Sequence, residues 1–80
     1  MTYLDYAENL SQYLRSYRTK YGLSQDLLSF KINIAEYSLR SYEEGAAIPH
    51  FKNLIKMADY FNVPLDELIG RKIKGKKNGT

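Results

Sequence analysis

Residues 22–49 read GLSQDLLSFKINIAEYSLRSYEEGAAIP and contain the strongest fold signal of the chain. It contains two short helical segments joined by a tight turn at residues 31–34, where Asn33 suits a left-handed backbone better than any residue except glycine. Ser24 is a good cap for the first segment, and Gly45 is placed to end the second. The pattern predicts a helix-turn-helix, a motif that holds its second helix outward, here at about residues 36–43.

The charge of the chain is divided unevenly along its length. Residues 71–80, RKIKGKKNGT, contain five basic residues and no acid, whereas residues 1–70 contain seven basic and nine acidic residues. The net charge of +3 is therefore the sum of a tail of +5 and a remainder of −2. We expect one helix-turn-helix domain at residues 1–70 and, at residues 71–80, a disordered basic tail that is too rich in lysine and glycine to bury apolar area.

The composition excludes several classes of function. The chain has no cysteine and one histidine, so thiol chemistry, disulfides and multi-histidine metal sites are excluded. It offers no glycine-rich phosphate loop and no carboxylate pair in an evident cleft, so we expect neither an enzyme nor a cofactor. No apolar run approaches the roughly 18 residues that span a membrane, and the first residues lack the features of a signal peptide. The expected location is the cytoplasm.

Three further helices are expected around the motif. Residues 2–21 are amphipathic, with Thr2 and Asp5 at the spacing of a capping box and Gly22 as the stop signal. A fourth helix is expected at residues 50–61 and a short fifth helix at residues 64–69. The apolar residues predicted for the inner face of the fourth helix are Phe51, Leu54, Ile55, Ala58 and Phe61. The fold class is therefore all-α with five helices.

Taken in order, these features resemble the phage repressor and Cro-like helix-turn-helix proteins, often called Xre-type regulators. The likeness runs without gaps from about Leu14 to Ile69, which is most of the folded chain. Its pieces are Leu14-Arg15 with Arg18, GLSQ at 22–25, the turn at 32–34, YEEG at 42–45 with Pro49, and VPLDELI at 63–69. Each piece alone is weak, whereas all of them in order at this spacing are strong. The resemblance implies a five-helix domain that binds operator DNA, usually as a dimer, to repress or activate transcription.

The resemblance also implies which residues meet the DNA. By position, the base-reading residues of the recognition helix are Glu36, Tyr37, Arg40 and Ser41. The residues placed at the DNA backbone and the half-site edge are Ser24, Gln25, Glu44, Ala46 and His50. Arg18 and Glu43 match a partly buried ion pair that ties the first helix to the end of the third. We expect that pair to be part of the scaffold, because a buried charge without its partner is costly.

Several positions depart from the family pattern. Ala35 stands where Ser or Thr usually caps the recognition helix, and such a cap is worth about 1 kcal/mol. Ala46 stands in a loop that usually carries a basic residue. The exposed surface of the recognition helix carries two acids, Glu36 and Glu44, and one base, Arg40, so its net charge is −1. A surface that binds DNA has to neutralise phosphates, which requires positive charge.

This acidity has two explanations. In the first, Glu36 accepts from cytosine N4, Arg40 binds guanine and Tyr37 packs on a thymine methyl or a phosphate, while the basic tail adds positive charge. In the second, the scaffold recognises a protein, as a module of antitoxin or anti-repressor type with little affinity for DNA, and its tyrosines are the anchors. We favour the first explanation, sequence-specific binding of double-stranded DNA by a transcriptional regulator, with repression as the leading mode.

A homodimer is expected because two half-sites double the sequence that is read. The apolar residues available near the usual contact region, on the fourth and fifth helices, are Met57, Tyr60, Leu65 and Ile69. We predict the dimer interface there. A regulatory protein is a further candidate partner, and no membrane contact is expected.

Overall fold

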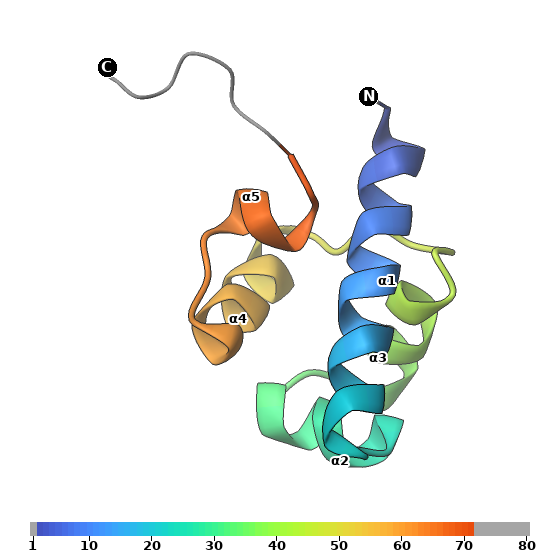
Figure 1. Cartoon of the computed structure of the whole chain (residues 1–80), viewed down its shortest axis with the longest axis vertical. Helices are drawn as coiled ribbons and strands as arrows, with labels where there is room; N and C mark the ends of the chain where they lie inside the picture. The colour runs from blue at the N-terminus through green and yellow to red at the C-terminus, as the bar shows by residue number, and fades with distance from the viewer. Residues whose placement is uncertain (1, 72–80) are drawn as a thin grey trace.

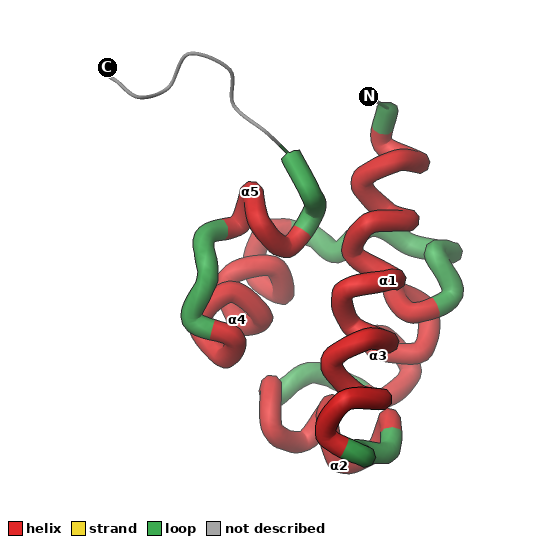
Figure 2. Tube along the Cα trace, viewed as in Figure 1, coloured by secondary structure: helices red, strands yellow, loops and turns green. Residues whose placement is uncertain are grey.

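The computed structural model describes residues 2–71, which form five α-helices (Figure 1). The helices are α1 (Tyr3–Tyr21), α2 (Gln25–Ile32), α3 (Glu36–Glu43), α4 (Phe51–Phe61) and α5 (Leu65–Leu68). All regular structure in this range is helical (Figure 2). The all-α, five-helix fold class is thereby confirmed. Most expected ranges differ from the observed ones only by flanking cap residues. The turn predicted at residues 31–34 is wrong at its start, because Lys31 and Ile32 still belong to α2 and the helix ends at Asn33. Most of the expected basic tail, residues 72–80, lies outside the described residues.

The helix ends are set by local signals. At the start of α1, the Asp5 amide donates to Thr2 Oγ1 at 3.4 Å and the Thr2 amide donates to the Asp5 carboxylate at 2.9 Å, which completes a capping box. The bond from the Thr2 amide holds the pKa of Asp5 below its usual 3.8. Gly22 ends α1 at φ 65° and Asn33 ends α2 at φ 72°, both in the left-handed region.

The core lies where the long helix α1 meets the other four. Figure 1 shows α1 with α4 and α5 to one side and α2 at its lower end, and α3 packs along α1. The buried apolar cluster draws on all five helices and consists of Leu10, Leu14, Leu28, Ile32, Leu39, Tyr42, Met57, Ala58 and Leu68. Each fully buried leucine of this kind contributes about 1.5–3 kcal/mol relative to an exposed one. The core therefore fixes how α2 and α3 sit against α1.

The inner face of α4 differs from the expected one. Phe51 and Ile55 are exposed, at 69% and 37% of their surface, whereas Met57 is fully buried beside Ala58. Since residues advance by about 100° around a helix, the buried arc is rotated toward Met57 and away from Ile55. Phe51 also lies in the first turn, where the helix extends beyond the core.

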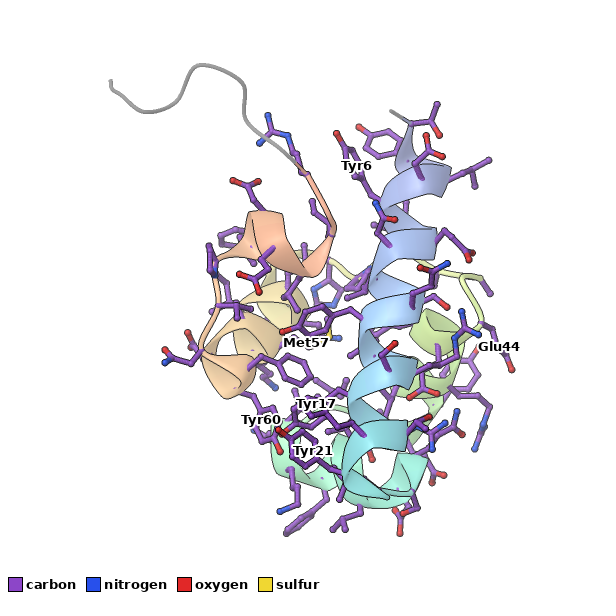
Figure 3. The ribbon with its side chains drawn as sticks, in the orientation of Figure 1. Tyr6, Tyr17, Tyr21, Glu44, Met57 and Tyr60 are labelled. Carbon is purple, nitrogen blue, oxygen red and sulfur yellow. The ribbon has the colours of Figure 1, made fainter. Side chains whose placement is uncertain are left out.

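The burial of Met57 corrects the predicted dimer interface. Its side chain has no exposed surface and points between α4 and α1 (Figure 3), so it cannot offer a face to a second protomer. Tyr60, Leu65 and Ile69 are half-buried against the core and keep some surface available.

None of the helices in residues 2–71 combines the length and the apolar character that crossing a membrane requires. In the same range, no three His, Cys, Asp or Glu side chains lie close enough together to hold a metal ion.

Candidate nucleic-acid interface

Helix α3 is anchored from its inner side. Leu39 is fully buried, and Tyr42 is buried with its hydroxyl accepting from Asn53 Nδ2 of α4 at 2.8 Å. The opposite side of α3 faces solvent, with Tyr37 exposed over 74% of its surface and Arg40 exposed as well. The helix is thus held rigidly by one face while the other remains free to contact a partner.

Glu36 and Arg40 form an ion pair on the free face of α3. Arg40 Nη2 donates to Glu36 Oε2 at 3.4 Å, and the two side chains are exposed over 48% and 42% of their surface. Exposed pairs of this spacing stabilise a helix only by about 0.3–0.5 kcal/mol. Both heads therefore remain available for contacts with a ligand. Ser41, the remaining residue expected to read bases, is half-buried beside them.

The end of α3 is tied to α1 through Arg18 and Glu43. Arg18 Nε donates to Glu43 Oε2 at 2.7 Å and Arg18 Nη2 donates to Glu43 Oε1 at 2.8 Å, so the guanidinium binds the carboxylate through both oxygens. The Glu43 side chain is only 3% exposed, and its bond raises the pKa of Arg18. Ser11 Oγ donates to the Glu43 backbone carbonyl at 2.6 Å. The structure thus contains the ion pair that the resemblance implied.

Gln25 makes a contact that sequence reasoning missed. Its Nε2 donates to Glu43 Oε1 at 3.0 Å, so the first residue of α2 is joined to the last residue of α3. The two residues lie 18 positions apart, and no local pattern signals such a bond. Gln25 is the first residue of α2, and the nitrogen of its side-chain amide is held by the ion pair.

The starts of α2, α3 and α4 are capped differently. Ser24 Oγ accepts from the Leu27 amide at 3.0 Å, whereas Ala35 before α3 and His50 before α4 make no side-chain cap bond. At the start of α4 the Asn53 amide donates to the His50 carbonyl at 3.1 Å, whereas the amides of Phe51 and Lys52 have no cap and can bind an anion.

Further charges border these helix starts. Glu44 and Ala46 are exposed just after α3, and Glu44 points away from α4 (Figure 3). Lys52 is exposed in the first turn of α4, two residues after His50, and is a cation that sequence reasoning had not counted near the DNA.

Lys56 Nζ donates to the Asn33 carbonyl at 2.8 Å and thereby supports the turn of the motif from α4. This bond, too, joins positions far apart in the chain.

The expected dimer region borders a cluster of aromatic rings between α1 and α4. Tyr17 and Tyr60 lie beside each other (Figure 3), and their hydroxyls are hydrogen-bonded at 3.2 Å. Phe61 packs edge-on against Tyr13, Tyr17 and Tyr60. The bond from Tyr60 and burial raise the pKa of Tyr17. Tyr60 is therefore bound within its own protomer and presents only part of its ring to solvent.

Comparison with known proteins gives the family. The chain matches the helix-turn-helix family model over residues 14–68. It is 33% identical to the HTH-type transcriptional regulator ImmR of Bacillus subtilis, over 90% of this chain and 57% of that protein. It is 32% identical to the cryptic phage CTXphi transcriptional repressor RstR of Vibrio cholerae, over 78% of this chain and 55% of that protein.

The chain spans little more than half the length of these curated relatives. No solved structure matches it. The family model covers all of the core helices from the middle of α1 to α5, which are the elements that position α3. The chain belongs to the helix-turn-helix family of Cro/C1 or Xre type, a family of DNA-binding transcriptional regulators and not of enzymes.

Proposed function

We propose that this protein binds double-stranded DNA sequence-specifically and represses transcription, with α3 in the major groove. The observation that carries the proposal is the anchoring of α3. Leu39 and Tyr42 fix one face of the helix in the core, and Glu36, Tyr37 and Arg40 stand on the other. A rigid helix that presents polar side chains on one face is what reading base edges requires.

Contacts to the DNA backbone come from the starts of the helices beside α3. The free amides of α4 after His50 and the start of α2 after Ser24 each supply about half a positive charge to a phosphate. Lys52 adds a full charge at the first of these sites. These contacts would set the register of α3 on the duplex without reading its sequence.

Specific contacts have to supply most of the affinity. On the outer side of α3, Glu36 and Glu44 offset Arg40, so few counterions are released when the protein meets DNA of arbitrary sequence. We therefore expect weak non-specific binding and a shallow dependence on salt.

We also propose that the protein works as a homodimer in the cytoplasm, where the DNA is. Two copies of α3 would then read half-sites about 34 Å apart, one turn of the duplex. Because Met57 is buried, the candidate dimer interface consists of Tyr60, Leu65 and Ile69. The two relatives named above are a transcriptional regulator and a transcriptional repressor, which supports regulation as the role.

A second candidate function is binding of a regulatory protein through the same outer surface. It is favoured by two exposed rings, Tyr37 on α3 and Phe30 on α2, with 74% and 81% of their surface in solvent. Aromatic side chains are frequent anchors of protein interfaces.

Selection from random duplex DNA with the full chain, at moderate salt, tests the proposed function. We expect enrichment of a palindrome, and a parallel selection with Arg40→Ala should lose preference at one position in each half-site. Absence of any enriched sequence, together with capture of a protein partner that depends on Tyr37, would replace DNA reading by the second function.

A further inference from the structure

We infer that Glu36 and Arg40 act as one unit, which reads both bases of a single G·C pair in each half-site. This inference rests on the proposed function and goes beyond it, because it assigns the two residues to the same base pair and fixes the orientation of that pair. Its basis is the geometry of their ion pair on the exposed face of α3.

The ion pair arranges hydrogen-bonding groups in a flat row. Residues four apart on a helix lie above one another on the same face, and here Arg40 Nη2 donates to Glu36 Oε2 at 3.4 Å. The N–H groups of a guanidinium lie in its plane, so an acceptor bound to one of them stays close to that plane. Arg40 keeps a two-donor edge free. A ligand that approaches this face therefore meets two donors of Arg40 followed by one acceptor of Glu36.

The major-groove edge of a G·C pair is the complement of this row. Guanine presents two acceptors, N7 and O6, and cytosine presents the N4 donor next to them. O6 and N4 are hydrogen-bonded to each other and thus about 2.9 Å apart. The 3.4 Å between Arg40 Nη2 and Glu36 Oε2 is somewhat longer than this spacing, and a small approach of these two exposed groups would bring the row into register with the base pair. Arg40 would bind N7 and O6 while Glu36 accepts from N4.

Other base pairs do not fit the same row. An A·T pair presents acceptor, donor, acceptor in order, so the second donor of Arg40 would meet the adenine amino group and Glu36 would meet thymine O4. A C·G pair presents the pattern in the opposite direction. The unit therefore selects one base pair out of four in one orientation.

The planar arrangement of the ion pair also decides whether Arg40 and Glu36 contact the same base pair or two neighbouring base pairs. Stacked base pairs are about 3.4 Å apart along the duplex, so the length of the ion pair alone would allow Arg40 and Glu36 to contact neighbouring pairs. Such contacts require the carboxylate to leave the guanidinium plane and to give up its bond to Nη2. Contacts with one pair retain that bond. Each charge is then compensated at all times, which is favourable in a groove from which water is displaced.

The test uses the full chain and a duplex enriched by the selection described above, with single atoms changed in the base pair that Arg40 reads. Replacing its guanine by 7-deazaguanine removes N7, and replacing its cytosine by N4-methylcytosine blocks the N4 donor in the groove. We expect each change to weaken binding by about fivefold or more. Glu36→Ala should become insensitive to N4-methylcytosine, and Arg40→Ala should become insensitive to 7-deazaguanine.

Asp59→Ala is the matched control. It removes an exposed acid on α4 that lies outside the residues proposed to contact DNA, so it alters binding only through net charge and should leave both sensitivities intact. The side chains of Arg40 and Asp59 are exposed and that of Glu36 is 42% exposed, and circular dichroism of each variant verifies that it folds. Sensitivity to the two modified bases at different base pairs, or unchanged sensitivity in Glu36→Ala, would overturn the shared reading while DNA binding itself stands. A selection that enriches no sequence would instead remove the proposed function and this inference with it.

Discussion

Replacing Arg18 by alanine tests how strongly the ion pair holds α3 in place. The change leaves the Glu43 carboxylate, 3% exposed, with the amide of Gln25 as its remaining side-chain donor. Removing one partner of a buried pair costs about 3–5 kcal/mol. Arg18 itself is 25% exposed, so water screens part of the interaction and we expect the lower end, about 3 kcal/mol. Domains of this size are stable by roughly 5–10 kcal/mol, so the loss is a large fraction.

Urea and thermal unfolding, followed by circular dichroism, measure this loss. A cost of 3 kcal/mol corresponds to a fall in Tm of about 12–24 °C, because 1 kcal/mol shifts a domain of this size by about 4–8 °C. Arg15→Ala is the matched control, since it makes the same substitution in the same helix at an exposed position, and it should change stability by no more than about 0.5 kcal/mol.

The double variant Arg18→Met with Glu43→Leu separates the cost of an unpaired charge from the worth of the pair. Replacing a buried ion pair by apolar residues of similar volume is often neutral or stabilising. We expect the double variant to regain most of the stability lost in Arg18→Ala. A loss below about 1 kcal/mol in Arg18→Ala, or a double variant as unstable as the single one, would refute the reasoning that an unpaired Glu43 charge is costly.

Three further predictions concern the start of α3, the aromatic cluster and the tail. Ala35→Ser places a capping side chain where none bonds now, and should raise the free energy of unfolding by about 1 kcal/mol; no gain would mean that the α3 amides are already satisfied. The pKa of Tyr17 is raised above 10.0 by its bond to Tyr60, so the stability from this contact is complete below pH 10.0 and is lost as pH rises through the folded-state pKa. Tyr60→Phe should bring that pKa back toward 10.0 in a titration of tyrosinate absorbance, and an unmoved titration would assign the shift to burial. Deleting residues 71–80 removes five basic residues, mostly outside the described range, and should flatten the salt dependence of DNA binding; an unchanged slope would exclude a role for the tail.

Helix ends could be predicted because the groups that set them are close in sequence. Thr2 and Asp5 meet within one turn, and the left-handed backbone at Gly22 and Asn33 is a property of those residues themselves. The start of the second helix and both ends of the third needed no information from distant parts of the chain, whereas the second helix continues through Ile32, two residues into the predicted turn. For the same reason the absence of a cap at Ala35 could be predicted from one residue.

The rotation of α4 could not be predicted in the same way. The periodicity of the sequence gives the width of the apolar arc of α4. Which edge of that arc is covered depends on the packing of α1, α2 and α5 against it. In the structure this packing buries Met57 and leaves Phe51 and Ile55 exposed. The bonds of Gln25 to Glu43 and of Lys56 to Asn33 were missed for a related reason. They join residues 18 and 23 positions apart, so only the packed fold brings them together.

Reading of sequence by α3 through specific contacts, on a surface with little net charge, is tested by comparing two affinities. The affinity of the full chain for the selected palindrome is measured beside its affinity for the same duplex with both half-sites scrambled, at one salt concentration. We expect a preference of about a thousandfold or more for the palindrome. Equal affinity for the two duplexes would contradict it.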